Sequence, residues 1–199
     1  MDKVYSCLSE KALIEGNERF SNGKLLNKDL SAQKRKELLE NTQKPMAVVI
    51  TCSDSRVSPE IIFDVGLGDI FVIRNAGNIV DDTVVENVEF AIEKFEIPYV
   101  LVLAHENCGA AGNAVEKVMK LEKLTGFSAH FEPIIKNIYT RGNKDISQSE
   151  LAAKVEEENV KQAVDTLLQS EMLSSLVKEG KLTIAKGKYY LGTGKVKVI

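Results

Sequence analysis

The stretch Y-V-L-V-L-A-H-E-N-C-G-A, residues 99–110, joins an apolar run to two residues that often bind metal ions. A short apolar run that follows a proline and is rich in Val and Leu is typical of a strand buried on both faces. His105 ends the run, Cys108 follows three residues later, and a helix is expected from Gly109 to about Leu124. The stretch therefore predicts a strand–turn–helix unit with two candidate metal ligands at the carboxyl end of the strand.

Similar units before and after this stretch predict an α/β fold. Strands alternate with helices that begin near Ser58-Pro59-Glu60 and at Asp81 or Asp82, and this alternation favours a parallel sheet with helices on its faces. We expect a mostly parallel central sheet of about four parallel strands plus a C-terminal edge strand, which a hairpin through Gly192 and Gly194 would form. The other expected parallel strands are 46–51, 69–74 and 182–185.

Residues 1–44 are expected to form an N-terminal helical arm that belongs to the same domain as an α/β core over residues 45–199. An amphipathic helix is predicted over 8–22, and a second helix, capped by Ser31, over 32–41. Residues 125–148 lack clear periodicity, so a loop with some helix is expected there. A long helix is predicted over 150–169, and a shorter one should follow it as far as Lys178.

The composition of the chain excludes several classes of function. The 199 residues carry a formal net charge of −3, so no basic surface points to nucleic acid. No apolar stretch is long enough to span a membrane, and the N-terminus has no apolar signal core, so a cytoplasmic protein is expected. The three cysteines, an odd number, argue against a disulfide framework.

A second group of reactive side chains follows the first predicted strand, in the stretch T-C-S-D-S-R-V, residues 51–57. Ligands of open α/β sheets bind outside the carboxyl ends of the strands, so Cys52 should lie near His105 and Cys108. Two thiolates and one imidazole suit Zn²⁺, and catalytic zinc sites typically use three protein ligands and one open position. The sequence therefore predicts a zinc site in which Asp54 and Arg56 lie beside the metal.

Each of these residues also has an ordinary interpretation. A cysteine at a strand end is usually a small buried apolar residue, and a carboxylate two residues from an arginine is usually a surface ion pair. The joint pattern, C-x-D-x-R after one strand and H-x-x-C after another, favours a functional site. Asp54 could be a fourth zinc ligand in a closed state, or Arg56 could hold it off the metal in an open state.

The sequence resembles the β-class carbonic anhydrases over nearly its whole length. The residues that carry the resemblance are C-S-D-S-R-V (52–57) and H-E-N-C-G-A (105–110), with G-N-E-R-F (16–20), G-D-I-F-V-I-R-N-A-G-N (68–78) and T-G-K-V (193–196) in support. The resemblance implies one Zn²⁺ per chain, held by Cys52, His105 and Cys108, with Asp54 and Arg56 as the catalytic pair. It also implies a homodimer or homotetramer and a substrate pocket that includes Gln43, Phe71 and Phe90.

The implied activity is the reversible hydration of CO2 to bicarbonate and a proton by zinc-bound hydroxide. One alternative is a CS2- or COS-type hydrolase on the same scaffold, which would have the same metal site. Another is a non-catalytic, zinc-stabilised interaction protein, in which Asp54 would have no effect on any rate. Nucleotide binding through Gly66 and Gly68 is disfavoured because Phe71 stands where a dinucleotide fingerprint has its third glycine.

Overall fold

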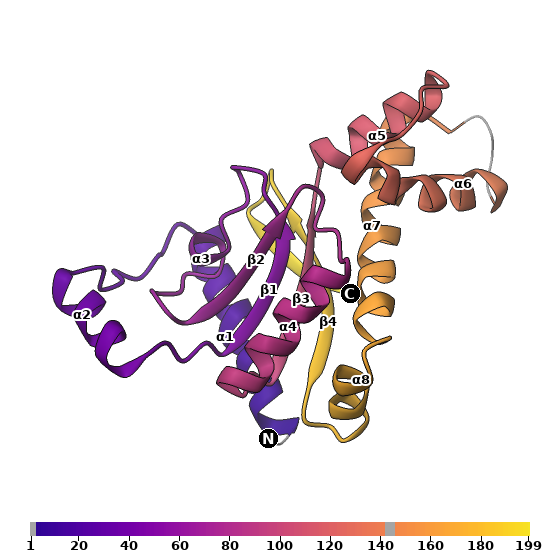
Figure 1. Ribbon diagram of the computed structural model, residues 1–199. Coiled ribbons are helices and arrows are strands. Elements are labelled where there is room, and N and C mark those ends of the chain that lie inside the picture. The colour runs from indigo at the N-terminus through magenta and orange to yellow at the C-terminus, as the bar shows by residue number, and fades with distance from the viewer. Residues whose placement is uncertain (1–2, 142–145) are drawn as a thin grey trace.

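A five-stranded sheet forms the centre of the computed structural model, which describes residues 3–141 and 146–199 (Figure 1). The strand order is β2-β1-β3-β4-β5, and the first four strands are parallel. The strands are β1 (Ala47–Cys52), β2 (Ile70–Asn75), β3 (Tyr99–His105), β4 (Thr183–Tyr190) and β5 (Lys195–Val198). This architecture confirms the predicted α/β fold, and β5 is the expected antiparallel edge strand.

Strand β4 is longer than the predicted 182–185. It pairs with the whole of β3, from Tyr99 opposite Thr183 to His105 opposite Tyr189. Lys186 and Lys188 hid this extension, because two lysines and a glycine interrupt the apolar pattern that marks a buried strand. The extension brings Lys188 to the end of the sheet where His105 lies.

Helices cover both faces of the sheet (Figure 1). One face packs against α1 (Lys3–Ser21) and α3 (Pro59–Ile62), with Leu13 and Ile62 fully buried in that layer. The other face packs against α4 (Asp82–Phe95), α7 (Gln148–Leu167) and α8 (Glu171–Lys178). Asp81 caps α4 by accepting a hydrogen bond from the backbone N–H of Val84, as its position before an apolar period predicts.

A third apolar cluster lies beyond the carboxyl ends of the parallel strands. It is formed by α5 (Gly109–Met119), the 3₁₀ turn Gly126–Phe131, α6 (Glu132–Arg141) and the first half of α7. Figure 1 shows these helices as a lobe beside the sheet. Cys52 and Cys108 belong to this cluster, so the candidate site lies between the sheet and the lobe.

The predicted loop with some helix over 125–148 is mostly helical where it is described, and residues 142–145 of it lie outside the described residues. The helix predicted from Gly109 ends at Met119, five residues earlier than expected, since Leu121 takes a left-handed conformation at φ 60°. No helix within residues 3–141 and 146–199 is long and apolar enough to cross a lipid bilayer.

The N-terminal arm consists of α1 and α2 (Ala32–Asn41), and the two helices differ in how they pack. Helix α1 belongs to the core: Asn17 donates to the carbonyls of Ile62 and Gly194. Helix α2 begins at the predicted Ser31 cap but has no buried residue. Figure 1 shows α2 projecting away from the sheet.

Candidate metal centre

The carboxyl ends of two neighbouring strands bring the predicted ligands together. Cys52 is the last residue of β1 and His105 the last of β3, and the two strands pair directly in parallel. Cys108 follows at the N-cap position of α5. One ligand atom from each residue lies within 4.8 Å of the others, and all three side chains are buried. The structure therefore assembles the three residues that the sequence predicted as ligands.

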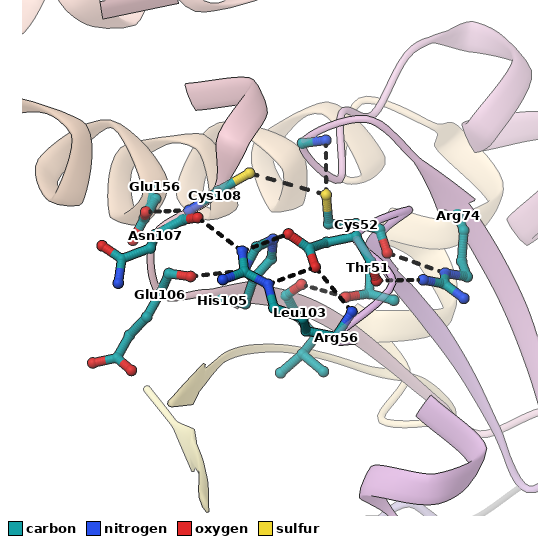
Figure 2. Close-up of polar contacts among 12 residues, drawn as sticks. Thr51, Cys52, Arg56, Arg74, Leu103, His105, Glu106, Asn107, Cys108 and Glu156 are labelled. Atoms are coloured by element: carbon teal, nitrogen blue, oxygen red, sulfur yellow. Dashed lines mark hydrogen bonds and ion pairs between the residues drawn. The ribbon is translucent and has the colours of Figure 1, made fainter. Parts of the chain in front are cut away.

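The geometry of this group fits a tetrahedral zinc site. Zn–S bonds of about 2.3 Å at tetrahedral angles place two sulfur atoms about 3.8 Å apart. The Sγ atoms of Cys52 and Cys108 are 4.0 Å apart (Figure 2). The distance therefore requires almost no movement of either cysteine on metal binding.

His105 is oriented as a metal ligand. Its Nδ1 lies 2.8 Å from the carbonyl oxygen of Glu106, so Nδ1 carries the proton and donates it (Figure 2). Nε2 is then left with a free lone pair, and it is buried with no hydrogen-bond partner among the described residues. A buried, unpaired ring nitrogen is costly unless something binds it. This atom is the observation that most directly indicates a metal ion.

The two thiols interact strongly with each other. The pKa of Cys52 lies well below the usual range of a thiol because Cys108 donates a hydrogen bond to it, and the backbone N–H of Gly77 adds to this effect. The pKa of Cys108 is raised because its proton is held by Cys52 and because it is buried. Metal binding at this pair would release the remaining thiol proton.

Arg56 holds the carboxylate of Asp54 in a bidentate ion pair. The guanidinium Nε and Nη2 atoms donate to the two carboxylate oxygens at 2.9 Å and 2.7 Å, and the backbone N–H of Arg56 donates to Oδ1 at 2.9 Å. This pairing lowers the pKa of Asp54 well below its usual range. The Oδ2 atom of Asp54 still lies 4.0 Å from His105 Nε2. Asp54 thus lies beside the candidate ligands and is held by Arg56. This is the arrangement expected for the open state, in which Arg56 keeps Asp54 away from the metal.

Several supporting residues were not anticipated from the sequence. Arg74, near the end of β2, donates to the carbonyls of Cys52 and Asp54 at 3.0 Å and 2.8 Å and so fixes the loop between them (Figure 2). Glu156 on α7 accepts a hydrogen bond from the backbone N–H of Cys108. Arg74 could have been noticed because it lies at the carboxyl end of a predicted apolar strand, beside the predicted ligands. Glu156 could have been noticed because it is a charged residue within the apolar face of a predicted helix.

The chain does not place the predicted pocket residues around its own cysteines. Phe71 lies opposite Val48, four residues before Cys52 on β1 and therefore about 13 Å along the strand. Phe90 is exposed on α4 and packs edge-on against Phe95, which also contacts Phe71. Gln43 precedes β1 and so lies at the amino end of the parallel strands, as Phe71 does. The predicted pocket is therefore not formed around the cysteines of a single chain.

Comparison with known proteins identifies the family of the chain. The model of the carbonic anhydrase family matches residues 47–196. The chain is 33% identical over 194 residues to a carbonic anhydrase of Mycolicibacterium smegmatis, covering 94% of this chain and 90% of that one. It is 35% identical over 187 residues to carbonic anhydrase 2 of Mycobacterium tuberculosis, covering 93% and 88%.

Solved structures show the same fold. The β-carbonic anhydrase CcaA is 27% identical and matches with a TM-score of 0.72, covering 95% of this chain and 94% of that one. The Coccomyxa β-carbonic anhydrase, solved in complex with acetazolamide, is 25% identical, with a TM-score of 0.66 and coverage of 94% and 86%. With the family matched over most of its length and the metal ligands assembled at its strand ends, the chain belongs to the carbonic anhydrase family, in the β class.

Proposed function

We propose that Cys52, His105 and Cys108 hold the zinc ion with which this β-class carbonic anhydrase interconverts CO2 and bicarbonate. The observation that supports this ligand set is the buried Nε2 atom of His105, which faces two cysteine sulfurs and has no partner among the described residues. When bound, zinc would lower the pKa of its water to about 7 and so supply hydroxide near neutral pH. The overall reaction is CO2 + H2O ⇌ HCO3⁻ + H⁺.

Asp54 and Arg56 are proposed as the catalytic pair. The bidentate contact with Arg56 keeps Asp54 ionised, so Asp54 accepts a hydrogen bond and orients the attacking oxygen but does not remove its proton. Arg56 also keeps the carboxylate from taking the fourth position of the site. The backbone carbonyl of Asn107 accepts from Arg56 Nη2 at 3.3 Å, which links the pair to the Cys108 turn.

Zinc analysis combined with CO2-hydration kinetics tests the roles of these residues. Cys52→Ser is expected to lose zinc and activity together. Asp54→Ala should retain zinc but lose about 10²-fold in kcat/KM, because it removes an orienting group from the reaction. A wild-type protein that is fully loaded with zinc yet inactive from pH 6 to 9 would refute the proposal.

The two alternatives from the sequence are not favoured. A non-catalytic zinc protein predicts that Asp54→Ala changes no rate, and the family match argues against that. A CS2 or COS hydrolase would share the metal site, so substrate assays separate it from a carbonic anhydrase. Hydrolysis of CS2 or COS without hydration of CO2 would support this alternative.

The protein is also proposed to form a homodimer or homotetramer in which helix α2 packs on a second copy. A ten-residue helix with no buried residue is marginal alone in water. Its Leu39 is 85% exposed. A groove of about 450 Å³ near the arm is lined by exposed leucine and isoleucine side chains, namely Leu25, Leu26, Leu30, Ile61 and Leu67. In this assembly Gln43, Phe71 and Phe90 would line the pocket of the neighbouring subunit.

Sedimentation measurements on Leu39→Glu test the assembly. The variant is expected to dissociate at concentrations at which the wild type is oligomeric, whereas Leu121→Glu, which is 95% exposed on the lobe, should not. An unchanged sedimentation coefficient for Leu39→Glu would contradict the proposed contact.

The arm and residues 45–199 are proposed to form one domain, which the buried contacts of α1 support. A cytoplasmic location is proposed because the three cysteines are free thiols, which are typical of reducing compartments.

A further inference from the structure

Helix α7 carries two buried polar side chains on the face that it packs against the site. Glu156 is 5% exposed and Asn159 is 2% exposed, and apolar residues such as Val155 and Val160 surround them on the same face. Residues three apart on a helix lie on one side of it. Burying a carboxylate or an amide is unfavourable unless its hydrogen bonds are satisfied. Both side chains find partners, and both sets of partners lead to the proposed cysteine ligands.

Glu156 holds the backbone of Cys108. Its Oε1 accepts the backbone N–H of Cys108 at 2.9 Å, as Figure 2 shows. Its Oε2 lies 3.1 Å from the ammonium group of Lys188, which is itself almost fully buried. Arg56 Nη2 donates to the carbonyl of Asn107 in the same peptide group, so Glu156 and Arg56 together fix the peptide from which that thiol projects. Glu156 thus contacts the backbone of Cys108 and not its sulfur.

Asn159 holds Gly77, the residue whose backbone N–H contacts the other cysteine. Its Nδ2 donates to the carbonyl of Gly77 at 2.8 Å, and the N–H of Gly77 donates to the Sγ atom of Cys52 at 3.3 Å. His130 Nε2 lies 3.2 Å from Asn159 Oδ1 and fixes the amide orientation by donating to it. Gly77 has φ 78°, and a Cβ there would lie 2.6 Å from the ring of Phe131. The N–H that reaches the thiolate therefore depends on glycine and on Asn159.

We propose that Glu156 and Asn159 are positioning residues, which hold both cysteine ligands from one turn of α7. This inference rests on the proposed zinc site and adds the residues that support it. Asn159 holds Gly77 so that the backbone N–H of Gly77 points at the Cys52 sulfur and stabilises its thiolate charge. Glu156 fixes the backbone of Cys108 and so sets the position from which its side chain extends. Outer groups that orient metal ligands typically change metal affinity by 10–100-fold when they are removed.

Zinc affinity, measured by competition with a chelator, tests the proposal on the full-length protein. Asn159→Ala and Glu156→Ala are each expected to weaken zinc binding by about 10–100-fold. Glu156→Gln keeps an oxygen that can accept from Cys108, so it should recover most of the affinity. Val160→Ala is the matched control: it removes a buried side chain of the same helix that has no polar contact, and should leave zinc affinity unchanged.

Cobalt substitution gives a second readout that a loss of packing would not change. Asn159→Ala removes the support of the hydrogen bond to Cys52, so the thiolate-to-cobalt charge-transfer band should shift, while Val160→Ala should keep the wild-type spectrum. If Asn159→Ala does not fold, Asn159→Asp decides, since it keeps the size but turns an oxygen toward the carbonyl of Gly77. It should weaken zinc binding at least as much.

The outcomes separate this inference from the proposed function. If the wild type binds no zinc, the proposed site itself is wrong. If the wild type binds zinc and both the Glu156 and Asn159 variants bind it equally well with unchanged cobalt spectra, only the role of α7 is refuted. Weakened binding by Val160→Ala to the same extent would also refute it, because the effect would then be one of helix packing.

Discussion

Replacing Lys188 by methionine is expected to destabilise the protein by about 3–5 kcal/mol, because it leaves a carboxylate buried without its counter-charge. The ammonium of Lys188 lies 3.1 Å from Glu156 Oε2, and the two side chains are only 8% and 4% exposed. Burial opposes the charge of Lys188, but Glu156 and Glu157 outweigh it and raise the pKa of the amine. Methionine keeps the length and apolar stem of lysine, so little packing should be lost.

A double-mutant cycle measures this pair. Urea unfolding at pH 7, with free zinc held constant by a metal buffer, gives the free energy of unfolding for each variant. The double variant with Glu156→Gln and Lys188→Met removes both charges and should be more stable than Lys188→Met alone. Lys186→Met on the same strand is the control, because Lys186 has no ion pair among the described residues; it should change stability by less than about 0.5 kcal/mol.

Two results would refute this reasoning. A loss of less than about 1 kcal/mol for Lys188→Met would show that Glu156 is solvated or paired in another way. A double variant no more stable than Lys188→Met would show that the buried charge is not the cause. The exposed Glu157, 3.5 Å from the amine, should contribute little in either case.

Three further predictions concern the surroundings of the site. Gly77→Ala should destabilise the protein by about 2–4 kcal/mol and weaken zinc binding, because the new Cβ would clash with Phe131 and alanine disfavours the left-handed backbone conformation at this position. An unchanged melting temperature and zinc affinity would contradict this. Arg56→Lys keeps the charge but loses the bidentate contact with Asp54, so stopped-flow assays should show kcat/KM lower by about 10–100-fold at full zinc content, and wild-type kinetics would argue against the pair. Burial lowers the pKa of His130, so as the pH falls the unfolded state binds a proton before the folded state does, and stability is lost below about pH 6.5. In urea unfolding, His130→Gln should therefore lose less stability than the wild type between pH 7.5 and 5.5. Equal losses in both proteins would be inconsistent with the lowered pKa.

The parallel sheet could be predicted because β1 and β3, two inner strands, are apolar over nearly their whole length. Residues buried on both faces leave a continuous signal, as in Ala47–Cys52 and Tyr99–His105, and turn residues mark the ends. The second half of strand β4 was not predicted, because it contains Lys186 and Lys188. There the ion pair of Lys188 with Glu156 replaces the apolar packing that a pattern can detect.

The grouping of the candidate metal ligands was also predictable, since residue type limits the chemistry. Few side chains bind zinc, and parallel strands bring their carboxyl ends to one edge, so Cys52, His105 and Cys108 could be grouped without coordinates. The pocket residues were different. Gln43, Phe71 and Phe90 came from resemblance alone, and one chain holds them at the other end of the sheet from its own cysteines.

The amino-acid sequence alone thus defines which atoms can hold the metal and which edge of the sheet they share. The support of those atoms depends on contacts between residues far apart in the chain: Glu156 reaches Cys108 across 48 positions, and Asn159 reaches Gly77 across 82. The position of Glu156 and Asn159 on the apolar face of a helix can indicate that they are buried, but no local pattern identifies their distant hydrogen-bond partners. Only the packing of α7 against the strand ends buries them and directs their hydrogen bonds to the two cysteine loops.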